Sequence, residues 1–284
     1  MSAPQNIIAV VFDFDDTLTD DSTTALLEAH GIDTREFWQK KMKALTDAGW
    51  DTTLAYLKLI LDETQAGKPL EGLSNADLSA FGARLNFYPG IPRFFTDLQN
   101  LVKKHDASHP SVEFYIISGG LEEIIRGSKI ASYFSGIWGY RFAEENGCIK
   151  HVMNAISYTE KTKYLFGINK GVEKVARKEA YAVNKRVDEA DRRIPFSNII
   201  YVGDGLTDVP CFSVVERFNG FPFGVFDPKK EGSPRKAWEQ LVAHKRTRSM
   251  NAPRYRKKDE LGALLRSAIT SICLQLDAKT GTAL

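Results

Sequence analysis

Residues 7–18 read IIAVVFDFDDTL, and this stretch decides the fold. Its first six residues are apolar without polar alternation, and the run ends abruptly at Asp13. A continuous apolar run of this length, closed by a turn, is typical of a strand buried on both faces of a parallel sheet. We therefore predict a buried strand of a parallel sheet over residues 7–12, with Asp13 and Asp15 at its carboxyl end.

Three further apolar runs have the same character, at residues 112–117, 199–202 and 221–226. Segments with helical spacing separate them, and valines at positions 172, 175, 183 and 187 predict a long helix over about 171–190. Strands that alternate with helices are the signature of an α/β fold. We expect a Rossmann-like, doubly wound and mostly parallel sheet.

Two segments depart from this alternation. Residues 20–87 contain helical patterns and no convincing strand, which predicts an all-helical insertion after the first strand. Residues 137–153 resemble a hairpin with Asn146-Gly147 as its tight turn. The expected organisation is an α/β core domain made of residues 1–19 and 88–284, with a helical domain over 20–87.

Composition narrows the class of protein. With 43% hydrophobic and 26% charged residues, the 284-residue chain has the composition of a globular enzyme or binding protein. No apolar run approaches the roughly 20 residues of a membrane span, and the first residues lack the basic start of a signal peptide. Three distant cysteines without CxxC spacing argue against a disulfide framework or a zinc site. We expect a cytoplasmic protein that does not enter a membrane.

The net charge of +2 conceals a basic segment. Residues 229–258 hold eleven Lys/Arg and two acidic residues, a balance of +9, so the remaining residues sum to −7. Such a segment allows nucleic-acid binding, but residues 233–243 have the pattern of an ordinary amphipathic helix, and charged stretches are usually solvated faces. We favour the solvated face over a nucleic-acid partner. The pattern leaves attraction of an anionic substrate or a subunit contact open, and it does not define the oligomeric state.

Polar residues follow three of the predicted strands. They are Asp13, Asp15 and Thr17, then Ser118-Gly119-Gly120, then Gly203-Asp204-Gly205 and Asp208. Because the carboxyl ends of strands in an open α/β sheet form the ligand crevice, these residues should converge. Clustered carboxylates favour a hard divalent cation such as Mg²⁺, and glycine-flanked amides before a helix favour an anion. The combination predicts phosphoryl transfer, with a carboxylate as a possible nucleophile.

On these residues the chain resembles the haloacid dehalogenase superfamily of phosphohydrolases, in its phosphoserine-phosphatase-like branch. The first motif is Asp13-Phe14-Asp15-Asp16-Thr17-Leu18, the second is Ser118-Gly119-Gly120, and the fourth is Gly203-Asp204-Gly205-Leu206-Thr207-Asp208. The third motif of the family is a lysine that opens a helix. Lys161 fits this motif best, and Lys163 is the alternative.

The resemblance implies a role for each matching residue. Asp13 would be the nucleophile and Asp15 the general acid and base, and Asp13, Asp15, Asp204 and Asp208 would form the Mg²⁺ shell. The phosphate-binding residues would be Thr17, Ser118, Gly119 and Lys161. Dehalogenases of the superfamily lack an acid at the position of Asp15 and its ATPases carry threonine there, so the aspartate favours a phosphatase or a phosphomutase. Mutases of the superfamily usually carry a different cap and different residues around the motifs, which favours the phosphatase.

The implied function is a Mg²⁺-dependent phosphatase that acts on a small phosphorylated metabolite through an aspartyl-phosphate on Asp13. The alternatives are a phosphotransferase of the same superfamily or a non-catalytic phosphate-binding module. The helical insertion would be a cap over the site, and its aromatic residues Phe37, Trp38, Trp50 and Tyr56 would line the pocket or fill the core of the cap.

The residues that would recognise the substrate do not follow one pattern. Phosphoserine phosphatases carry glutamate nine residues after the nucleophile, whereas Ser22 stands there in this chain. Arg35 and Arg84 are candidate contacts for an anionic substrate. The departure at Ser22 argues against phosphoserine itself, and the sequence identifies no other substrate.

Overall fold

The computed structural model describes residues 5–172, 179, 181–228, 232–247 and 249–281. Its sheet has seven strands in the order β4-β3-β2-β1-β5-β6-β7. β3 and β4 are antiparallel, and the other neighbouring pairs are parallel. The strands are β1 (Ile7–Phe12), β2 (Ser111–Leu121), β3 (Phe134–Glu145), β4 (Cys148–Asn154), β5 (Ile199–Gly203), β6 (Phe221–Val225) and β7 (Met250–Asn251). This arrangement is the mostly parallel α/β sheet that the sequence predicts.

β1 lies at the centre of the sheet and is buried, as its sequence predicts. Val10 pairs with Phe114 of β2 on one side and with Ile200 of β5 on the other. Residues 8–12 of the strand have no exposed surface. Burial on both faces explains why the strand is apolar throughout instead of alternating.

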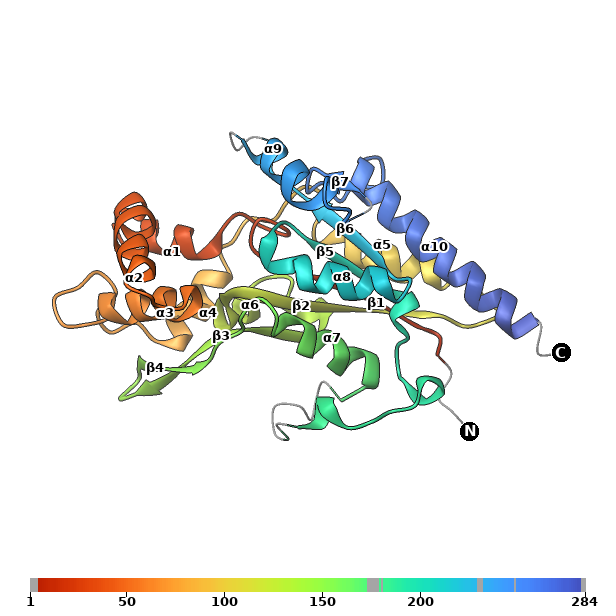
Figure 1. Ribbon diagram of the computed structural model, residues 1–284, viewed down its shortest axis with the longest axis horizontal. Helices are drawn as coiled ribbons and strands as arrows, with labels where there is room; N and C mark the ends of the chain where they lie inside the picture. Colours follow the sequence, from red (N-terminus) through yellow and green to blue (C-terminus); the bar gives the residue numbers. More distant parts are fainter. Residues whose placement is uncertain (1–4, 173–178, 180, 229–231, 248, 282–284) are drawn as a thin grey trace.

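Helices cover both faces of the sheet (Figure 1). α5 (Arg93–Val102) and α10 (Glu260–Gly281) pack together on one face, and α7 (Lys161–Lys170) and α8 (Val209–Arg217) pack together on the other. By length and composition α10 could cross a membrane over Glu260–Thr280, whereas the sequence predicts no membrane-spanning segment. Three apolar residues of this helix, Leu265, Ile269 and Ile272, are buried in the core of the protein.

A helical insertion separates β1 from α5. It contains α1 (Ser22–Ala29), the π-helical η1 (Glu36–Met42), α2 (Lys43–Asp47), α3 (Thr52–Glu63) and α4 (Asn75–Gly82). Its two connections to the sheet lie side by side, since Tyr88 donates its backbone N–H to Leu18 and the Thr19 hydroxyl donates to the Asn86 carbonyl at 2.6 Å. The helices gather beyond the carboxyl end of β1 (Figure 1).

The insertion is docked on the core through α4, which crosses α6 (Glu122–Gly127). A side chain at Gly82 would collide with the backbone of Ile124, so glycine permits this close crossing. The β3–β4 hairpin adds a contact, because Ile149 donates its N–H to the Leu73 carbonyl at 2.9 Å. The predicted turn at Asn146-Gly147 is present in this hairpin.

The long helix predicted over about 171–190 is wrong in the part that the structure describes. α7 ends at Lys170 because Gly171 adopts a left-handed conformation with φ of 73°. Residues 173–178 and 180 lie outside the described residues, and Val183 and Val187 are only half-buried. The remaining short helical elements are η2 (Ala131–Tyr133), η3 (Ala182–Asn184), η4 (Glu189–Asp191), η5 (Phe196–Asn198), η6 (Leu206–Asp208), α9 (Ser233–Ala237) and the π-helical η7 (Trp238–Val242).

Candidate functional site

Three strand ends meet at one edge of the sheet. Phe12, the last residue of β1, pairs with Ile116 of β2 and with Val202 of β5. Asp13 continues this alignment by donating its N–H to the Val202 carbonyl at 2.9 Å. The register therefore brings Asp13, Ser118 and Asp204 to the same edge, as the sequence predicts for residues at the carboxyl ends of parallel strands.

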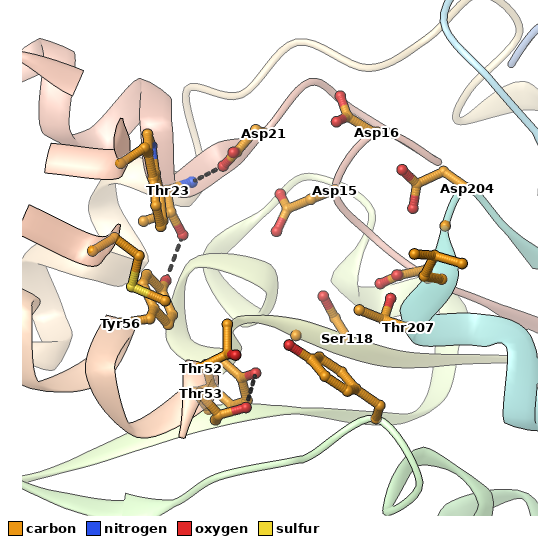
Figure 2. Close-up of a pocket in the computed structure, with 18 residues that line it drawn as sticks. Asp15, Asp16, Asp21, Thr23, Thr52, Thr53, Tyr56, Ser118, Asp204 and Thr207 are labelled. Carbon is orange, nitrogen blue, oxygen red and sulfur yellow. Dashed lines mark hydrogen bonds between the residues drawn. The ribbon is translucent and has the colours of Figure 1, made fainter. Parts of the chain in front are cut away.

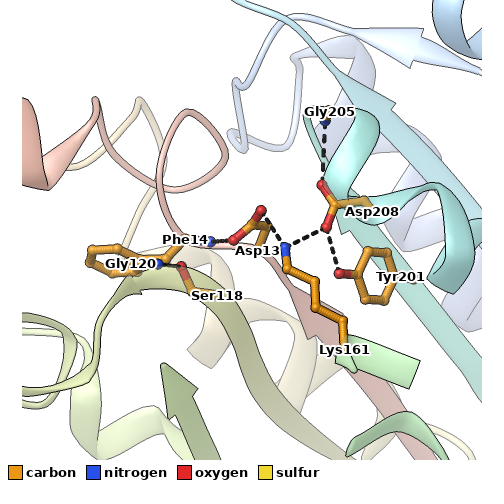
Figure 3. A network of polar contacts seen from close by, with 8 residues as sticks. All are labelled: Asp13, Phe14, Ser118, Gly120, Lys161, Tyr201, Gly205 and Asp208. Atoms are coloured by element: carbon orange, nitrogen blue, oxygen red, sulfur yellow. Dashed lines mark hydrogen bonds and ion pairs between the residues drawn. The ribbon is translucent and has the colours of Figure 1, made fainter. Parts of the chain in front are cut away.

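A buried lysine joins two carboxylates at this edge (Figure 3). Lys161, the first residue of α7, donates from Nζ to Asp13 Oδ2 at 2.7 Å and to Asp208 Oδ1 at 2.8 Å. Asp208 also accepts from the hydroxyl of Tyr201 at 2.7 Å, and Asp13 Oδ1 accepts from the N–H of Phe14 at 2.7 Å. Lys161 is 1% exposed, so the ammonium group is held in one place.

Burial and neighbouring charges have opposite effects on the pKa values of Asp13 and Lys161. Burial raises the pKa of Asp13 to about 6, although the Lys161 ammonium works in the opposite direction. Burial alone would lower the pKa of Lys161, but the carboxylates of Asp13 and Asp208 outweigh it and raise that pKa. Lys161 is therefore a fixed positive charge beside Asp13 at neutral pH.

Three carboxylates are close enough to share a metal ion. One oxygen each of Asp13, Asp204 and Asp208 lies within 4.8 Å of the others. Among the described residues no hydrogen bond reaches the Asp204 carboxylate, and burial followed by repulsion from Asp13 and Asp208 raises its pKa well above the usual value. A half-buried carboxylate that accepts no hydrogen bond from the described residues and lies beside two others has the chemistry of a divalent-cation ligand.

Asp208 differs from its two neighbours in the number of hydrogen bonds that its carboxylate accepts, which is three, whereas Asp13 accepts two. Oδ1 is bound by Lys161 and Tyr201, and Oδ2 accepts the N–H of Gly205 at 3.3 Å. Asp13 and Asp204 also line the cavity whereas Asp208 does not, so these two fit direct metal ligation best. Asp208 is suited to holding Lys161 and the 203–205 turn in position.

Asp15 lies against the Ser118-Gly119-Gly120 segment. A side chain at Gly120 would collide with the Asp15 carboxylate, so the glycine makes this approach possible. Asp15 Oδ1 accepts the N–H of Ser22 at 2.8 Å, and the Ser118 hydroxyl accepts the N–H of Gly120 at 2.9 Å. Burial, aided by the charge of Asp21, raises the pKa of Asp15 to about 8. The Asp15 carboxyl is therefore protonated at neutral pH in the metal-free protein.

A cavity of about 340 Å³ opens from these residues toward the helical insertion (Figure 2). The core supplies its floor, and η1, α3 and the segment around Tyr140 supply its wall. The lining residues are Asp13, Asp15, Asp16, Asp21, Thr23, Trp38, Met42, Thr52, Thr53, Tyr56, Ser118, Gly119, Tyr140, Tyr158, Asp204, Gly205, Leu206 and Thr207.

Hydrogen bonds fix the aromatic side chains of the wall. The Tyr56 hydroxyl shares a 2.7 Å bond with Thr23, and the Trp38 indole N–H donates to Thr24 Oγ1 at 2.9 Å. The rings of Trp38 and Tyr56 stack with centroids 5.6 Å apart, and Tyr140 adjoins Tyr56. Of the four aromatic residues expected in the pocket or the cap core, Phe37 is fully buried and Trp50 is half exposed.

The structure brings together most of the residues predicted for the site. Asp13, Asp15, Ser118, Gly119 and Asp204 line the cavity, while Lys161 and Asp208 lie directly behind Asp13. The alternative lysine, Lys163, instead pairs with Glu160 at 3.0 Å.

Four predicted residues do not reach the cavity. The hydroxyls of Thr17 and Ser22 are fully buried without a hydrogen-bond partner, so Thr17 presents no hydroxyl to a phosphate there. Arg35 is exposed and is not a lining residue. Arg84 is exposed over the ring of Phe81, on another surface of the insertion. Arg35 directly precedes η1 and Arg84 lies in the turn after α4, so neither arginine belongs to a helix face that lines the cavity.

The described part of the basic segment 229–258 contributes no residue to the lining of the cavity. Residues 233–242 form α9 and η7, close to the helix predicted there, and Arg235 pairs with Glu239 at 2.7 Å. Tyr255 is buried and donates to the Thr17 carbonyl at 2.8 Å, which anchors the loop after β1. Residues 229–231 and 248 lie outside the described residues.

Sequence reasoning missed several members of the site. Tyr201 lies within the apolar run of β5, and a tyrosine in such a run is typical of a core residue. Asp21 and Tyr140 line the cavity without belonging to any motif. The acidic pair Asp20-Asp21 just before a predicted helix was the available signal, since an N-cap aspartate is fixed in place.

Comparisons with known proteins agree with this geometry. The family model for haloacid dehalogenase-like hydrolase matches residues 10–213. An uncharacterized protein of Borreliella burgdorferi is 32% identical over 239 residues, which cover 76% of this chain and 80% of that protein.

Solved structures share the fold at low identity. A HAD family hydrolase of Salmonella enterica serovar Typhi superposes with a TM-score of 0.56 at 16% identity, covering 87% of this chain and 67% of that one. A phosphoserine phosphatase solved as a phospho-aspartyl intermediate analogue gives 0.54 at 15%, covering 92% and 99%. A substrate-bound phosphoserine phosphatase gives 0.52 at 14%, covering 92% and 97%.

Proposed function

The chain belongs to the haloacid dehalogenase-like hydrolases, and from this premise we propose that it is a Mg²⁺-dependent phosphomonoester hydrolase acting through an aspartyl-phosphate on Asp13. The observation that carries the proposal is the pairing of Asp13 with the buried ammonium of Lys161, at the floor of a cavity that Asp15 also lines. A nucleophile and a proton donor thus face the same space.

The first half-reaction joins Asp13 to the substrate. A carboxylate oxygen of Asp13 forms a bond to phosphorus while the bond from phosphorus to the alcohol oxygen breaks. The Asp15 carboxyl gives its proton to that departing oxygen, so the alcohol leaves neutral. The raised pKa of Asp15 supports this role, because a carboxyl with a pKa of about 8 is still protonated at pH 7.

The second half-reaction restores the enzyme. Asp15, now a carboxylate, takes a proton from water, whose oxygen attacks phosphorus as the bond to Asp13 breaks. Phosphate leaves, and Asp15 is again protonated for the next turnover. One residue therefore serves as acid and then as base, as the resemblance implies.

Lys161 and the Ser118 segment would stabilise the charge on the transferring group. The Lys161 ammonium lies 2.7 Å from Asp13 Oδ2 and keeps Asp13 ionised against the effect of burial. The Ser118 hydroxyl and the Gly119 amide are the candidate donors to phosphate oxygens. Fixed donors in a site that excludes water lower the barrier more than mobile water does.

Asp13 and Asp204 would hold Mg²⁺, with Asp208 positioned behind them. The ion would offset the negative charge of these carboxylates and of the phosphoryl oxygens. The helical insertion would act as a cap that excludes bulk water and contacts the leaving group.

The test is the Asp13→Asn variant, assayed with p-nitrophenyl phosphate at saturating Mg²⁺. Asparagine keeps the volume but removes the nucleophile, so turnover should fall by at least about 10³-fold while the far-UV circular dichroism is unchanged. Asp20→Asn is the matched control, because that exposed carboxylate lies outside the cavity and should keep full activity. Undiminished turnover by Asp13→Asn would refute the proposal, and transfer of phosphate to added alcohols would identify a phosphotransferase instead.

A further inference from the structure

We call the part of the cavity that is lined by Asp21, Trp38 and Tyr56 of the insertion the leaving-group end. Its charge pattern is unusual for a site that binds phosphate esters. In the described part of the chain, the lining residues include no lysine, arginine or histidine. Lys161 is directed at Asp13 and Asp208 behind the floor, and the two arginines of the insertion considered above lie elsewhere. A carboxylate or a second phosphate on the leaving group would find no cation in this wall.

The aromatic side chains of the wall also offer few free donors. Tyr56 and Trp38 use their polar atoms on Thr23 and Thr24, at 2.7 and 2.9 Å, and Tyr140 turns its hydroxyl to Thr53 at 3.4 Å. Trp38, Tyr56 and Tyr140 therefore present ring surfaces to a ligand, while Thr52, Tyr158 and Thr207 also line the cavity. Ring faces carry negative quadrupole charge and attract cations.

Asp21 adds a fixed negative charge beside these rings (Figure 2). It lines the cavity between Asp15 and the first turn of α1. As the N-cap of α1 it accepts the N–H groups of Thr23 and Thr24 at 3.0 and 2.9 Å, so it cannot turn away. A negative group on the substrate would meet a like charge here, whereas an ammonium group would meet an opposite one.

Resting on the proposed phosphatase activity, we propose that the substrate is the phosphate ester of an amino alcohol without a carboxylate, whose ammonium group lies between Asp21 and the rings of Trp38 and Tyr56. The inference identifies a specificity residue, Asp21, that no motif contains. It also gives a physical reason for a preference against phosphoserine, because the carboxylate of phosphoserine would be buried near Asp21 with no cationic partner in the described wall.

Three phosphate esters that differ in the charge of the leaving group test whether the site prefers an ammonium group and disfavours a carboxylate. Phosphoethanolamine is phosphoserine without the carboxylate, and 2-hydroxyethyl phosphate replaces its ammonium with a neutral hydroxyl. We expect kcat/KM for phosphoethanolamine to exceed that for phosphoserine by about tenfold or more, with 2-hydroxyethyl phosphate between them. Equal values for the three esters, or a preference for phosphoserine, would overturn the inference.

Asp21→Asn tests the residue itself. Asparagine is an equally good N-cap, so α1 should keep its stability while the charge is removed. The ratio of kcat/KM between phosphoethanolamine and phosphoserine should narrow by about fivefold or more, and Asp20→Asn should leave the ratio unchanged. An unchanged ratio in a folded Asp21→Asn protein would remove Asp21 from the proposal.

The same assays separate this inference from the proposed function. A protein that hydrolyses p-nitrophenyl phosphate and prefers phosphoserine is a phosphatase for which the inference fails. A protein that hydrolyses neither p-nitrophenyl phosphate nor any of the three esters contradicts the phosphatase proposal, and with it the inference.

Discussion

The two ends of the cavity are built differently. At the phosphate end, Lys161, Asp13 and Asp208 come from three separate elements of the core and are joined by direct ionic hydrogen bonds. At the leaving-group end, the polar atoms of Trp38 and Tyr56 bond to neighbouring threonines within the insertion. Transfer of the phosphoryl group is common to all phosphate esters and needs fixed charges. Selection of one ester instead needs a cavity wall that is complementary to its leaving group.

Because the two ends are built differently, we expect substitutions at each end to affect different properties of the protein. Changes at the phosphate end should damage turnover of every substrate and also the stability of the core. Changes at the leaving-group end should alter the choice of substrate and leave the binding of inorganic phosphate intact.

Lys161→Met should have the largest effect on both turnover and stability. It leaves the buried carboxylates of Asp13 and Asp208 without their cation, which costs about 3 kcal/mol in the free energy of unfolding. We expect kcat for p-nitrophenyl phosphate to fall by about 10²-fold or more. Urea unfolding and steady-state kinetics measure the two quantities.

The matched control is Lys163→Met, two residues along the same helix. Lys163 is partly exposed and pairs with Glu160, and a surface ion pair contributes only about 0–1 kcal/mol. Equal losses in the two variants would contradict the assignment of the fixed charge to Lys161.

The stability of the metal-free protein should fall as pH rises from about 5 to about 8.5. The pKa values of Asp13 and Asp15 are raised to about 6 and about 8 in the folded state, so within this window the folded protein binds more protons than the unfolded chain. Their contribution to stability is complete below the unfolded pKa of about 4 and is lost as pH passes through the folded values.

Mg²⁺ should reverse this trend, because it requires the deprotonated carboxylates. The rise in melting temperature on adding Mg²⁺ should be larger at pH 8 than at pH 6, by several degrees, in differential scanning calorimetry. Asp204→Asn should lose most of this rise. A Mg²⁺ effect that is independent of pH would show that the ion binds elsewhere.

The sequence predicted the phosphate end far better than the leaving-group end. Apolar strands and the register of a parallel sheet bring Asp13, Ser118 and Asp204 together, so their convergence follows from local patterns. The faces of the insertion helices depend on tertiary packing, so the sequence left open whether Trp38 lines the cavity or fills the core of the insertion. Thr17 belongs to a motif, yet packing buries its hydroxyl.

Trp38→Leu should sharpen the contrast between the two ends. Loss of the indole removes part of the wall and the stacking on Tyr56, so kcat/KM for phosphoethanolamine should fall by about tenfold. The inhibition constant of inorganic phosphate should stay within about twofold, because the proposed reaction has phosphate bound at the core end. Trp50→Leu, at an exposed tryptophan outside the cavity, should change neither value, and a parallel loss of phosphate binding in Trp38→Leu would contradict the separation.

Tyr201→Phe should give the smallest effect and is the finest test of the comparison. The Tyr201 hydroxyl donates to Asp208 Oδ1, the same oxygen that holds Lys161, and it touches neither the cavity nor Asp13. Its removal should cost about 1 kcal/mol of stability and lower kcat about threefold to tenfold, with KM unchanged, because Lys161 is held less firmly.

Tyr255→Phe separates positioning from packing in this test. Tyr255 is a second buried tyrosine, whose hydroxyl donates to the Thr17 carbonyl at 2.8 Å instead of to a carboxylate. Its loss should cost similar stability with a smaller change in kcat, and the pH dependence of kcat should move in Tyr201→Phe alone. If both variants lose stability but keep kcat and its pH profile, Tyr201 supports only the core, and Asp208 needs no partner besides Lys161 to hold the phosphate end in place.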